Sequence, residues 1–271
     1  MGGVEQKREA IRTIWTFQEV AMNTPFQIVH SSKDPAGSRI ARFIREAGEE
    51  VLTLEEDLLY MEKELETDLI VFASRHKSES GKPSFTVHAP GNFNRADFGG
   101  KPSTLGMASA IANRTFLEEF HRRKVSFDAF DISLEVTHHG PTLDTPSVFV
   151  ELGSSEKEWG NLDAAKLVAD VIVNGVKRLG EEETCEIAIG FGGGHYAPKF
   201  TREVMKAGSA ISHICPKYQF EHLTPDMIDE MLKKTVEEVE IALIDWKSFR
   251  KDERNRLIRI IEASGIEWRR V

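Results

Sequence analysis

The chain has 271 residues, of which 40% are hydrophobic and 29% charged, and its formal net charge at pH 7 is -9. This length and composition are sufficient to bury a full core and are typical of a soluble globular protein. The acidic balance argues against non-specific binding to DNA or to acidic membranes, because such binding depends on a basic surface. The sequence also predicts no membrane span, since no apolar run approaches the roughly 20 residues that a bilayer requires.

The N-terminal residues carry mixed charges and no apolar segment of the secretory kind, so a cytoplasmic location is expected. Residues 3–22 have the apolar spacing of a helix that ends before a proline. We therefore expect residues 1–25 to be a helical extension and residues 26–271 to be a single α/β domain.

The two cysteines, Cys185 and Cys215, are too few for a disulfide framework. They also lack the paired spacing of a thiolate zinc site. Free thiols in a reducing compartment are expected.

The predicted domain opens with a strand at 26–30, a turn at 31–38 that contains serines and a glycine, and a helix that ends at Gly48. Such a turn can hold a phosphate at the N-terminus of the helix. It matches no P-loop pattern, however, so an unliganded turn is the favoured interpretation.

Strands and helices are predicted to alternate along the rest of the chain. Further strands are expected at 69–73, 85–88, 131–138, 146–154, 186–189, 210–215, 241–246 and 266–271. Helices are expected at 104–124, 161–179, from Pro198, at 224–240 and through 256–263. The alternation predicts an α/β fold with a mixed, mostly parallel sheet flanked by helices on both faces.

The strand predicted at 131–138 carries the clearest chemical pattern. Its alternation places Glu135, Thr137 and His139 on one face, so a carboxylate, a hydroxyl and an imidazole lie together. The glycine and proline that follow end the strand and leave His138 and His139 where it meets a loop.

Polar clusters follow the carboxyl ends of five predicted strands. They are His30, residues 74–77, residues 88–92, the pair His138 and His139, and residues 192–195. Because the carboxyl ends of parallel strands share one edge of a sheet, these segments are expected to converge on a single crevice.

Two chemical interpretations of this crevice stay open. In the first, imidazoles together with Glu135 or Glu151 hold a catalytic zinc, although no short zinc motif is present. In the second, a histidine is the general base for water, and Asn92 with the glycine amides stabilises an oxyanion. No nucleophile elbow and no dinucleotide fingerprint are found, so water is the expected nucleophile.

Taken together, the motifs resemble those of the archaeal and plant type of D-aminoacyl-tRNA deacylase. The matching segments run from about Phe26 to Lys247 and are 74–83, 86–93, 137–141, 151–154 with Trp159, 192–198 with Phe200 and Thr201, and 245–247. The resemblance implies hydrolysis of the ester that joins a D-amino acid to tRNA. It also implies a zinc-dependent monomer with a fold akin to phosphorylase and peptidyl-tRNA hydrolase proteins.

With this resemblance, candidate roles are given residue by residue. The catalytic candidates are His139 or His195 as general base, His138 beside them, Glu135 as the orienting carboxylate and Asn92 as an oxyanion donor. The expected substrate contacts are Arg75, His76, Lys77, His88, Thr137, Gly192, Gly193 and Gly194, and the three glycines also supply oxyanion donors. The expected zinc ligands are His138, His139, His195 and Glu151.

An acidic chain can still bind the acceptor end of a tRNA if cations gather around the crevice. The candidates are Arg75, Lys77, Lys82, Arg95, Lys101, Lys199 and Arg202. Two alternatives remain. One is a nucleoside phosphorylase or hydrolase, which predicts a dependence on phosphate, and the other is a non-catalytic module that binds a tRNA end without turnover.

Overall fold

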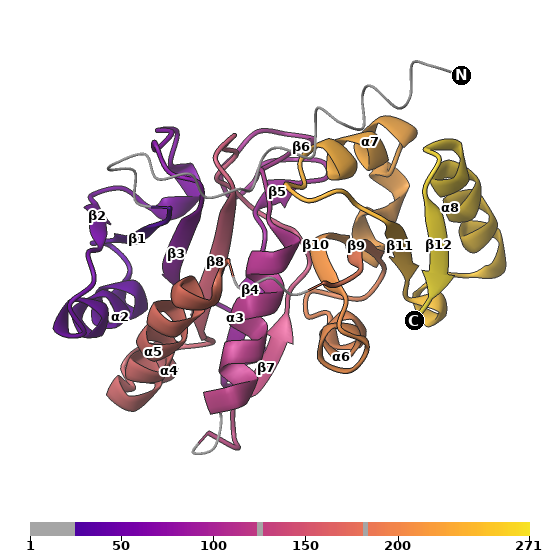
Figure 1. Ribbon diagram of the computed structural model, residues 1–271. Helices are drawn as coiled ribbons and strands as arrows, with labels where there is room; N and C mark the ends of the chain where they lie inside the picture. The colour runs from indigo at the N-terminus through magenta and orange to yellow at the C-terminus, as the bar shows by residue number, and fades with distance from the viewer. Residues whose placement is uncertain (1–24, 124–126, 181–183) are drawn as a thin grey trace.

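The computed structural model describes residues 25–123, 127–180 and 184–271. The helix predicted at 3–22 lies outside these ranges. Within them the strands form two larger sheets and one two-stranded ribbon, which stand side by side in Figure 1. No helix in the described ranges is long and apolar enough to cross a membrane.

The larger sheet has six strands in the order β2-β1-β3-β8-β4-β7. Their bounds are Gln27–Ser31 for β1, Leu52–Leu54 for β2, Ile70–Arg75 for β3, Ser84–His88 for β4, Asp131–Leu134 for β7 and Ser147–Gly153 for β8. β1, β2, β3 and β8 run parallel, whereas β4 and β7 run together in the opposite direction. The predicted mixed, mostly parallel sheet is confirmed.

The reversal at β4 changes where the strand exits lie. Because β4 pairs antiparallel with β8, His88 at the end of β4 lies beside Phe149 in the middle of β8. The expectation that all five polar segments share one edge of the sheet is therefore wrong. Strand direction depends on how the loops turn, which periodicity along the sequence does not reveal.

One face of the larger sheet is covered by helices α2 (Pro35–Glu46), α3 (Ala110–Arg123) and α5 (Leu162–Arg178) (Figure 1). Val71, Phe85 and Val148 of the sheet are part of the core cluster on this side. The opposite face carries a smaller apolar cluster around Phe72 and Phe149. That second face is the one that also carries the polar site described below.

The second sheet has the parallel order β10-β9-β11-β12. Its strands are Ile187–Phe191 for β9, Ala210–Cys215 for β10, Ile241–Ile244 for β11 and Glu267–Arg270 for β12. Its helices are α6 (Pro198–Ala207), α7 (Pro225–Lys233) and α8 (Lys251–Ala263). α3 packs on both β4 and β10 and so joins the two sheets.

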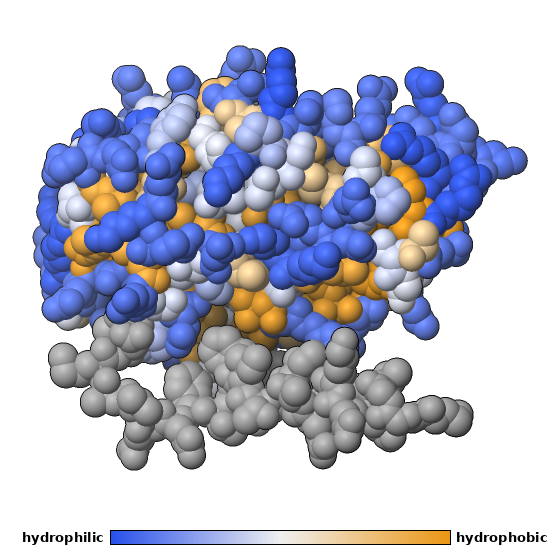
Figure 2. Space-filling model, turned by 90° about the horizontal axis from the view of Figure 1, so that it is seen from above, coloured by the Kyte–Doolittle hydropathy of each residue, from blue (hydrophilic) through white to orange (hydrophobic). Residues whose placement is uncertain are grey.

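Short elements complete the fold. The ribbon pairs β5 (Gly91–Asn92) with β6 (Thr104–Leu105), and α4 spans Glu156–Trp159. The 3-10 turns of the described residues are η1 (Leu58–Tyr60), η3 (Lys217–His222) and η4 (Trp246–Ser248). The face in Figure 2 is mostly hydrophilic and is broken by white and orange areas. Cys185 and Cys215 are free thiols.

Two helix boundaries differ from the prediction for related reasons. The helix predicted at 104–124 begins at Ala110, because Thr104 and Leu105 pair with β5 and Ser109 caps the helix by accepting the Ala112 N–H at 3.0 Å. The helix predicted at 224–240 ends at Lys233. Residues 235–240 beyond it are not helical, and Glu237 accepts the N–H groups of Ala110 and Ile111.

The carboxylate of Asp34 occupies the helix N-terminus in the turn at 31–38. Asp34 Oδ1 accepts the N–H groups of Ala36 and Gly37, each at 2.9 Å, and Oδ2 accepts the Arg75 N–H at 2.7 Å. The donors that a phosphate would use at this helix N-terminus are therefore bonded to a carboxylate.

Candidate active site

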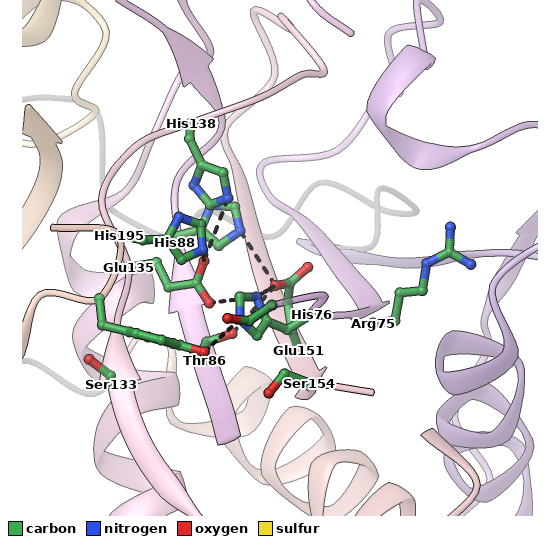
Figure 3. Close-up of polar contacts among 12 residues, drawn as sticks. Arg75, His76, Thr86, His88, Ser133, Glu135, His138, Glu151, Ser154 and His195 are labelled. Carbon is green, nitrogen blue, oxygen red and sulfur yellow. Dashed lines mark hydrogen bonds and ion pairs between the residues drawn. The ribbon is translucent and has the colours of Figure 1, made fainter. Parts of the chain in front are cut away.

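The site is built on three neighbouring strands of the larger sheet. The register places Ser74 of β3 and Thr86 of β4 on either side of Glu151 of β8. Ser74 Oγ donates to Glu151 Oε1 at 2.9 Å, and Thr86 Oγ1 donates to Oε2 at 3.4 Å. His88, two residues after Thr86, lies on the same face, as the alternation of a strand requires. Figure 3 shows Thr86, His88 and Glu151 close together in this site.

Glu135 is the central carboxylate, and its side chain is fully buried. Oε1 lies 2.9 Å from His76 Nδ1, and Oε2 lies 3.0 Å from His195 Nε2 and 3.5 Å from His138 Nε2 (Figure 3). One carboxylate therefore faces three imidazoles from three separate segments.

The position of Glu135 follows from a crossing of the chain between sheets. The strand predicted at 131–138 is in the larger sheet only as far as Leu134. Glu135 then forms an antiparallel bridge with Tyr196, and Thr137 N–H donates to the Ile214 carbonyl at 2.9 Å. Glu135 N–H still donates to the Val87 carbonyl of β4 at 3.0 Å, so the chain passes from the larger sheet to the second between Glu135 and Thr137, and the site lies at this junction.

Three histidines have one ring nitrogen fixed by the backbone. Nδ1 lies 3.2 Å from the Ala89 carbonyl in His88, 2.8 Å from the Val136 carbonyl in His138 and 2.6 Å from the Gly140 carbonyl in His139. A carbonyl only accepts, so in the neutral form of each imidazole Nδ1 carries the proton and Nε2 keeps its lone pair. This is how a metal-binding imidazole is oriented.

The donor set fits a metal ion. Ligand atoms lie within 4.8 Å of one another in three groups, which are His88, His138 and His139; His76, Glu135 and His195; and His88, Glu135 and Glu151. The buried His88 Nε2 and both Glu135 oxygens make no hydrogen bond of acceptable angle with the described residues, although ring nitrogens lie close to the oxygens. A buried polar atom left unpaired costs about 1–3 kcal/mol, and a cation would satisfy all three.

Charge is unevenly distributed over the imidazoles. Burial alone would lower the pKa of His76, but its contacts with the carboxylates of Glu135 and Glu151 outweigh burial and raise that pKa to about 11. Burial and the neighbouring His88 lower the pKa of His139 to about 4. At neutral pH, His76 is therefore an imidazolium and His139 is neutral.

The carboxylates and the remaining imidazoles are consistent with this pattern. Burial would raise the pKa of Glu135, yet its contacts with His195 and His76 hold that pKa well below its usual range. Burial lowers the pKa of His138, and the neighbouring His139 lowers it further. Burial would also lower the pKa of His88, but the contact with Glu151 outweighs it and raises that pKa. The site pairs ionised carboxylates with His76 and keeps His138 available as a neutral ligand or base.

Of the residues predicted as catalytic or as metal ligands, the structure brings most together. His138, His195 and Glu135 are in direct contact, and the His139 ring meets the His138 ring edge to face with centroids 4.3 Å apart. Asn92 has a different position, because its Nδ2 donates to the Gly99 and Lys101 carbonyls at 2.9 and 3.3 Å. Both of its N–H groups are used there, which leaves none for a substrate oxyanion.

Two of the three glycine N–H groups predicted as oxyanion donors are already hydrogen-bonded within the protein. Gly192 N–H donates to the Cys215 carbonyl at 2.8 Å, and Gly193 N–H donates to Ser248 Oγ at 2.9 Å. Within the described ranges, only the Gly194 N–H of the three has no protein acceptor.

Two other predicted site positions also lie elsewhere. Thr137 Oγ1 bonds His213 Nδ1 at 3.2 Å inside the second sheet, so it does not face the cluster. His30 lies across the larger sheet, where Nε2 is 2.9 Å from Thr53 Oγ1.

The predicted cations are less free than the sequence suggests. Lys82 pairs with Asp131, Arg75 with Asp57, Arg95 with Asp97 and Lys199 with Asp245. Lys77, Lys101 and Arg202 have no ion-pair partner in the part of the chain that the structure describes.

Sequence reasoning missed Tyr196 as a site residue. Its hydroxyl lies 2.9 Å from His76 Nε2, so it contacts the imidazolium from the side opposite Glu135. The available signal was the motif at 192–198, in which the tyrosine directly follows His195. Ser74 and Thr86 were also missed as partners of Glu151, because only the register of the strands shows the contact.

Comparisons with known proteins identify the family of this chain. Residues 63–269 match the family model described as D-aminoacyl-tRNA deacylase. A D-aminoacyl-tRNA deacylase of Methanocaldococcus jannaschii is 38% identical over 91% of this chain and 99% of its own length, and one of Pyrococcus furiosus is 36% identical over 80% and 82%. The crystal structure of a conserved protein of unknown function superposes with a TM-score of 0.84 at 31% identity, over 92% of this chain and 96% of that one. The chain belongs to the D-aminoacyl-tRNA deacylase family.

Proposed function

We propose that the cluster around Glu135 hydrolyses the ester bond of D-aminoacyl-tRNA and releases a free D-amino acid and tRNA. The observation that carries the proposal is a fully buried carboxylate with ring nitrogens at 2.9 and 3.0 Å from its two oxygens. An aminoacyl ester is already activated, so a positioned water, a base and oxyanion donors are sufficient without a covalent nucleophile.

His195 is our candidate for the general base. Its side chain is 36% exposed, the most open of the imidazoles that contact Glu135. With Nε2 facing Glu135, Nδ1 is left to take a proton from the attacking water, and the imidazolium that forms is stabilised by the carboxylate. The same proton then passes to the ribose oxygen that leaves.

The negative charge on the ester oxygen needs donors as it develops. His76 supplies a buried positive charge held by Glu135 and Tyr196, and the Gly194 amide supplies an N–H without a protein acceptor. Such donors act strongly in a site that excludes water.

We also propose that zinc binds here, held by the Nε2 atoms of His88, His138 and His139 or by the neighbouring group around Glu135. When bound, zinc polarises a carbonyl and lowers the pKa of water. Metal analysis of the purified protein tests this directly. About one or more zinc ions per chain are expected, with loss of zinc in a His138→Ala, His139→Ala double variant.

The biological context follows from the substrate. Removal of D-amino acids from tRNA is a quality-control step of translation, which we place in the cytoplasm, and we propose that the enzyme acts as a monomer on the acceptor end. A nucleoside phosphorylase is less favoured, since the helix N-terminus that would take its phosphate is capped by Asp34.

The test compares release of amino acid from a D-aminoacyl-tRNA and from its L counterpart, before and after chelation and zinc add-back. D-selective release that is lost on chelation and restored by zinc supports both proposals. D-selective release that is indifferent to chelation supports the deacylase without the metal. No release from either substrate with zinc present contradicts the deacylase proposal.

A further inference from the structure

Three aromatic side chains are unusually open to solvent. Within the described ranges, the rings that are more than half exposed are Phe98 at 67%, Tyr218 at 56% and Tyr60 at 55%. Apolar surface left in water costs free energy unless a partner covers it. The three rings are far apart in the sequence, but each lies on a segment that borders the histidine cluster.

Phe98 and Tyr60 lie on the side of His139. The Phe98 carbonyl accepts the N–H of Gly140, the residue after His139, at 3.0 Å. Leu59, next to Tyr60 in η1, packs so tightly here that a Cβ on Gly99 or Gly140 would lie 1.9 or 2.2 Å from its carbonyl oxygen. The segments that carry the two rings are therefore packed against each other and against the residue after His139.

Tyr218 lies on the side of His195. It is in η3, whose first residue, Lys217, donates its N–H to the Gly193 carbonyl at 3.1 Å. Asn94 Nδ2 lies 3.0 Å from His222 Nε2 and links η3 to the loop that carries Phe98. The segment of Tyr218 is thus joined to the loop of Phe98 at the same site.

The loop that holds Phe98 is rigidly built. Gly99 and Gly100 have φ values of 75° and 74°, in the left-handed region that favours glycine, and the Asn92 amide is bonded to the carbonyls of Gly99 and Lys101. A ring held outward by such a loop loses little conformational entropy when it binds a partner.

Unpaired cations lie on segments that border the same cluster. Lys101 is in the same loop as Phe98, Lys77 follows His76, and Lys247 precedes Ser248, which accepts the Gly193 N–H. All three are exposed and have no ion-pair partner in the described ranges. Aromatic faces for bases and cations for phosphates are the combination that binds single-stranded nucleic acid.

Resting on the deacylase function proposed above, we infer that Tyr60, Phe98 and Tyr218 form a stacking platform for the unpaired nucleotides at the 3′ end of the tRNA. The bases stack on the rings, and Lys77, Lys101 and Lys247 contact the phosphates. Stacking is tolerant of sequence and ignores the amino acid, so the platform holds the single-stranded end that all tRNAs share. It leaves the selection of the D-amino acid to the residues around Glu135.

The test uses the full chain with Phe98→Leu and Tyr218→Leu, which remove a ring, and Phe98→Trp, which keeps one. The matched control is Leu162→Ala, at an exposed apolar residue at the start of α5. Affinity for an uncharged single-stranded RNA with the 3′ sequence of tRNA is measured by fluorescence anisotropy, and kcat and KM are measured with D-aminoacyl-tRNA.

We expect each leucine variant to weaken RNA binding and raise KM by at least about fivefold, with kcat within about twofold of wild type. Phe98→Trp and Leu162→Ala should behave as wild type. Leucine variants that bind RNA as tightly as wild type would overturn the platform and leave the deacylase standing. If the wild-type chain hydrolyses no aminoacyl-tRNA, the deacylase proposal fails, and the RNA titration still decides for or against the platform.

Discussion

At the scale of single residues, the site depends on opposite charges that are buried together. A buried carboxylate such as Glu135 is costly to ionise, and the pair is kept charged because His76 lies 2.9 Å away. His195 faces the same carboxylate but is partly exposed to solvent. The buried His76 therefore carries the positive charge, and the partly exposed His195 is the residue that substrate can reach.

Replacing His195 by alanine removes the proposed base. Turnover of D-aminoacyl-tRNA should fall by about 100-fold or more, the usual contribution of a general base, while folding changes little because the side chain is partly exposed. Initial rates measure the effect. His121→Ala is the control, since the Nδ1 of that histidine bonds the Leu117 carbonyl within α3. A loss of turnover of similar size in this control would count against the assignment of His195.

His213 should give stability a pH dependence. Burial lowers its folded pKa to about 4 from an ordinary value of 6.5, so the neutral form is required in the fold. The unfolded chain binds a proton first, and the contribution of His213 is complete above about pH 6.5 and is lost as pH falls toward 4.

Between pH 7.5 and pH 5 this amounts to about 2 kcal/mol. His213→Gln keeps a donor for the Lys234 carbonyl without the titration, so its free energy of unfolding should fall by about 2 kcal/mol less over that range. Urea denaturation at the two pH values checks this. Equal losses in both proteins would contradict it.

Among the secondary-structure elements, most strands and helices were predicted from the sequence, but the direction of each strand relative to its neighbours in the sheet was not. The helix predicted from residue 161 does begin there, where Asn161 caps α5, because a cap is a local signal. The antiparallel placement of β4 and the crossing of the chain after Leu134 depend on contacts between distant segments. For the same reason, periodicity put Thr137 on the face of Glu135, whereas its hydroxyl bonds His213.

The loop of Phe98 offers a test of close backbone packing. Gly99 and Gly265 have similar φ values, 75° and 73°, but a Cβ on Gly99 would collide with Leu59 while one on Gly265 would meet nothing within 4 Å. Gly265→Ala should cost only the left-handed strain of about 1–2 kcal/mol. Gly99→Ala should cost clearly more, and thermal unfolding that shows equal losses would contradict the packing described.

At the scale of the whole molecule, two sheets share one helix. α3 packs on β4 of the larger sheet and on β10 of the second, and the site lies where the chain crosses between the sheets. A site at such a junction requires both sheets to be folded. The position of Glu135 is therefore a property of the complete domain, and the sequence alone indicated its chemistry but not its place.

The shared helix predicts cooperative unfolding. Trp159 reports on the side of the larger sheet, and Trp246 with Trp268, stacked at 6.1 Å, reports on the second. One variant keeps Trp159 but lacks Trp246 and Trp268, and a second keeps that pair but lacks Trp159. The urea midpoints that the two variants report should coincide. Two separate transitions would show that the sheets are independent units.

Turnover of D-aminoacyl-tRNA by Glu135→Gln decides whether this carboxylate is part of the catalytic site. Glutamine keeps the shape of the side chain but removes the charge that holds His76 and His195. We expect turnover to fall at least about 100-fold, while circular dichroism and binding of uncharged RNA stay close to those of wild type. A folded Glu135→Gln protein with wild-type turnover would show that the chemistry takes place elsewhere.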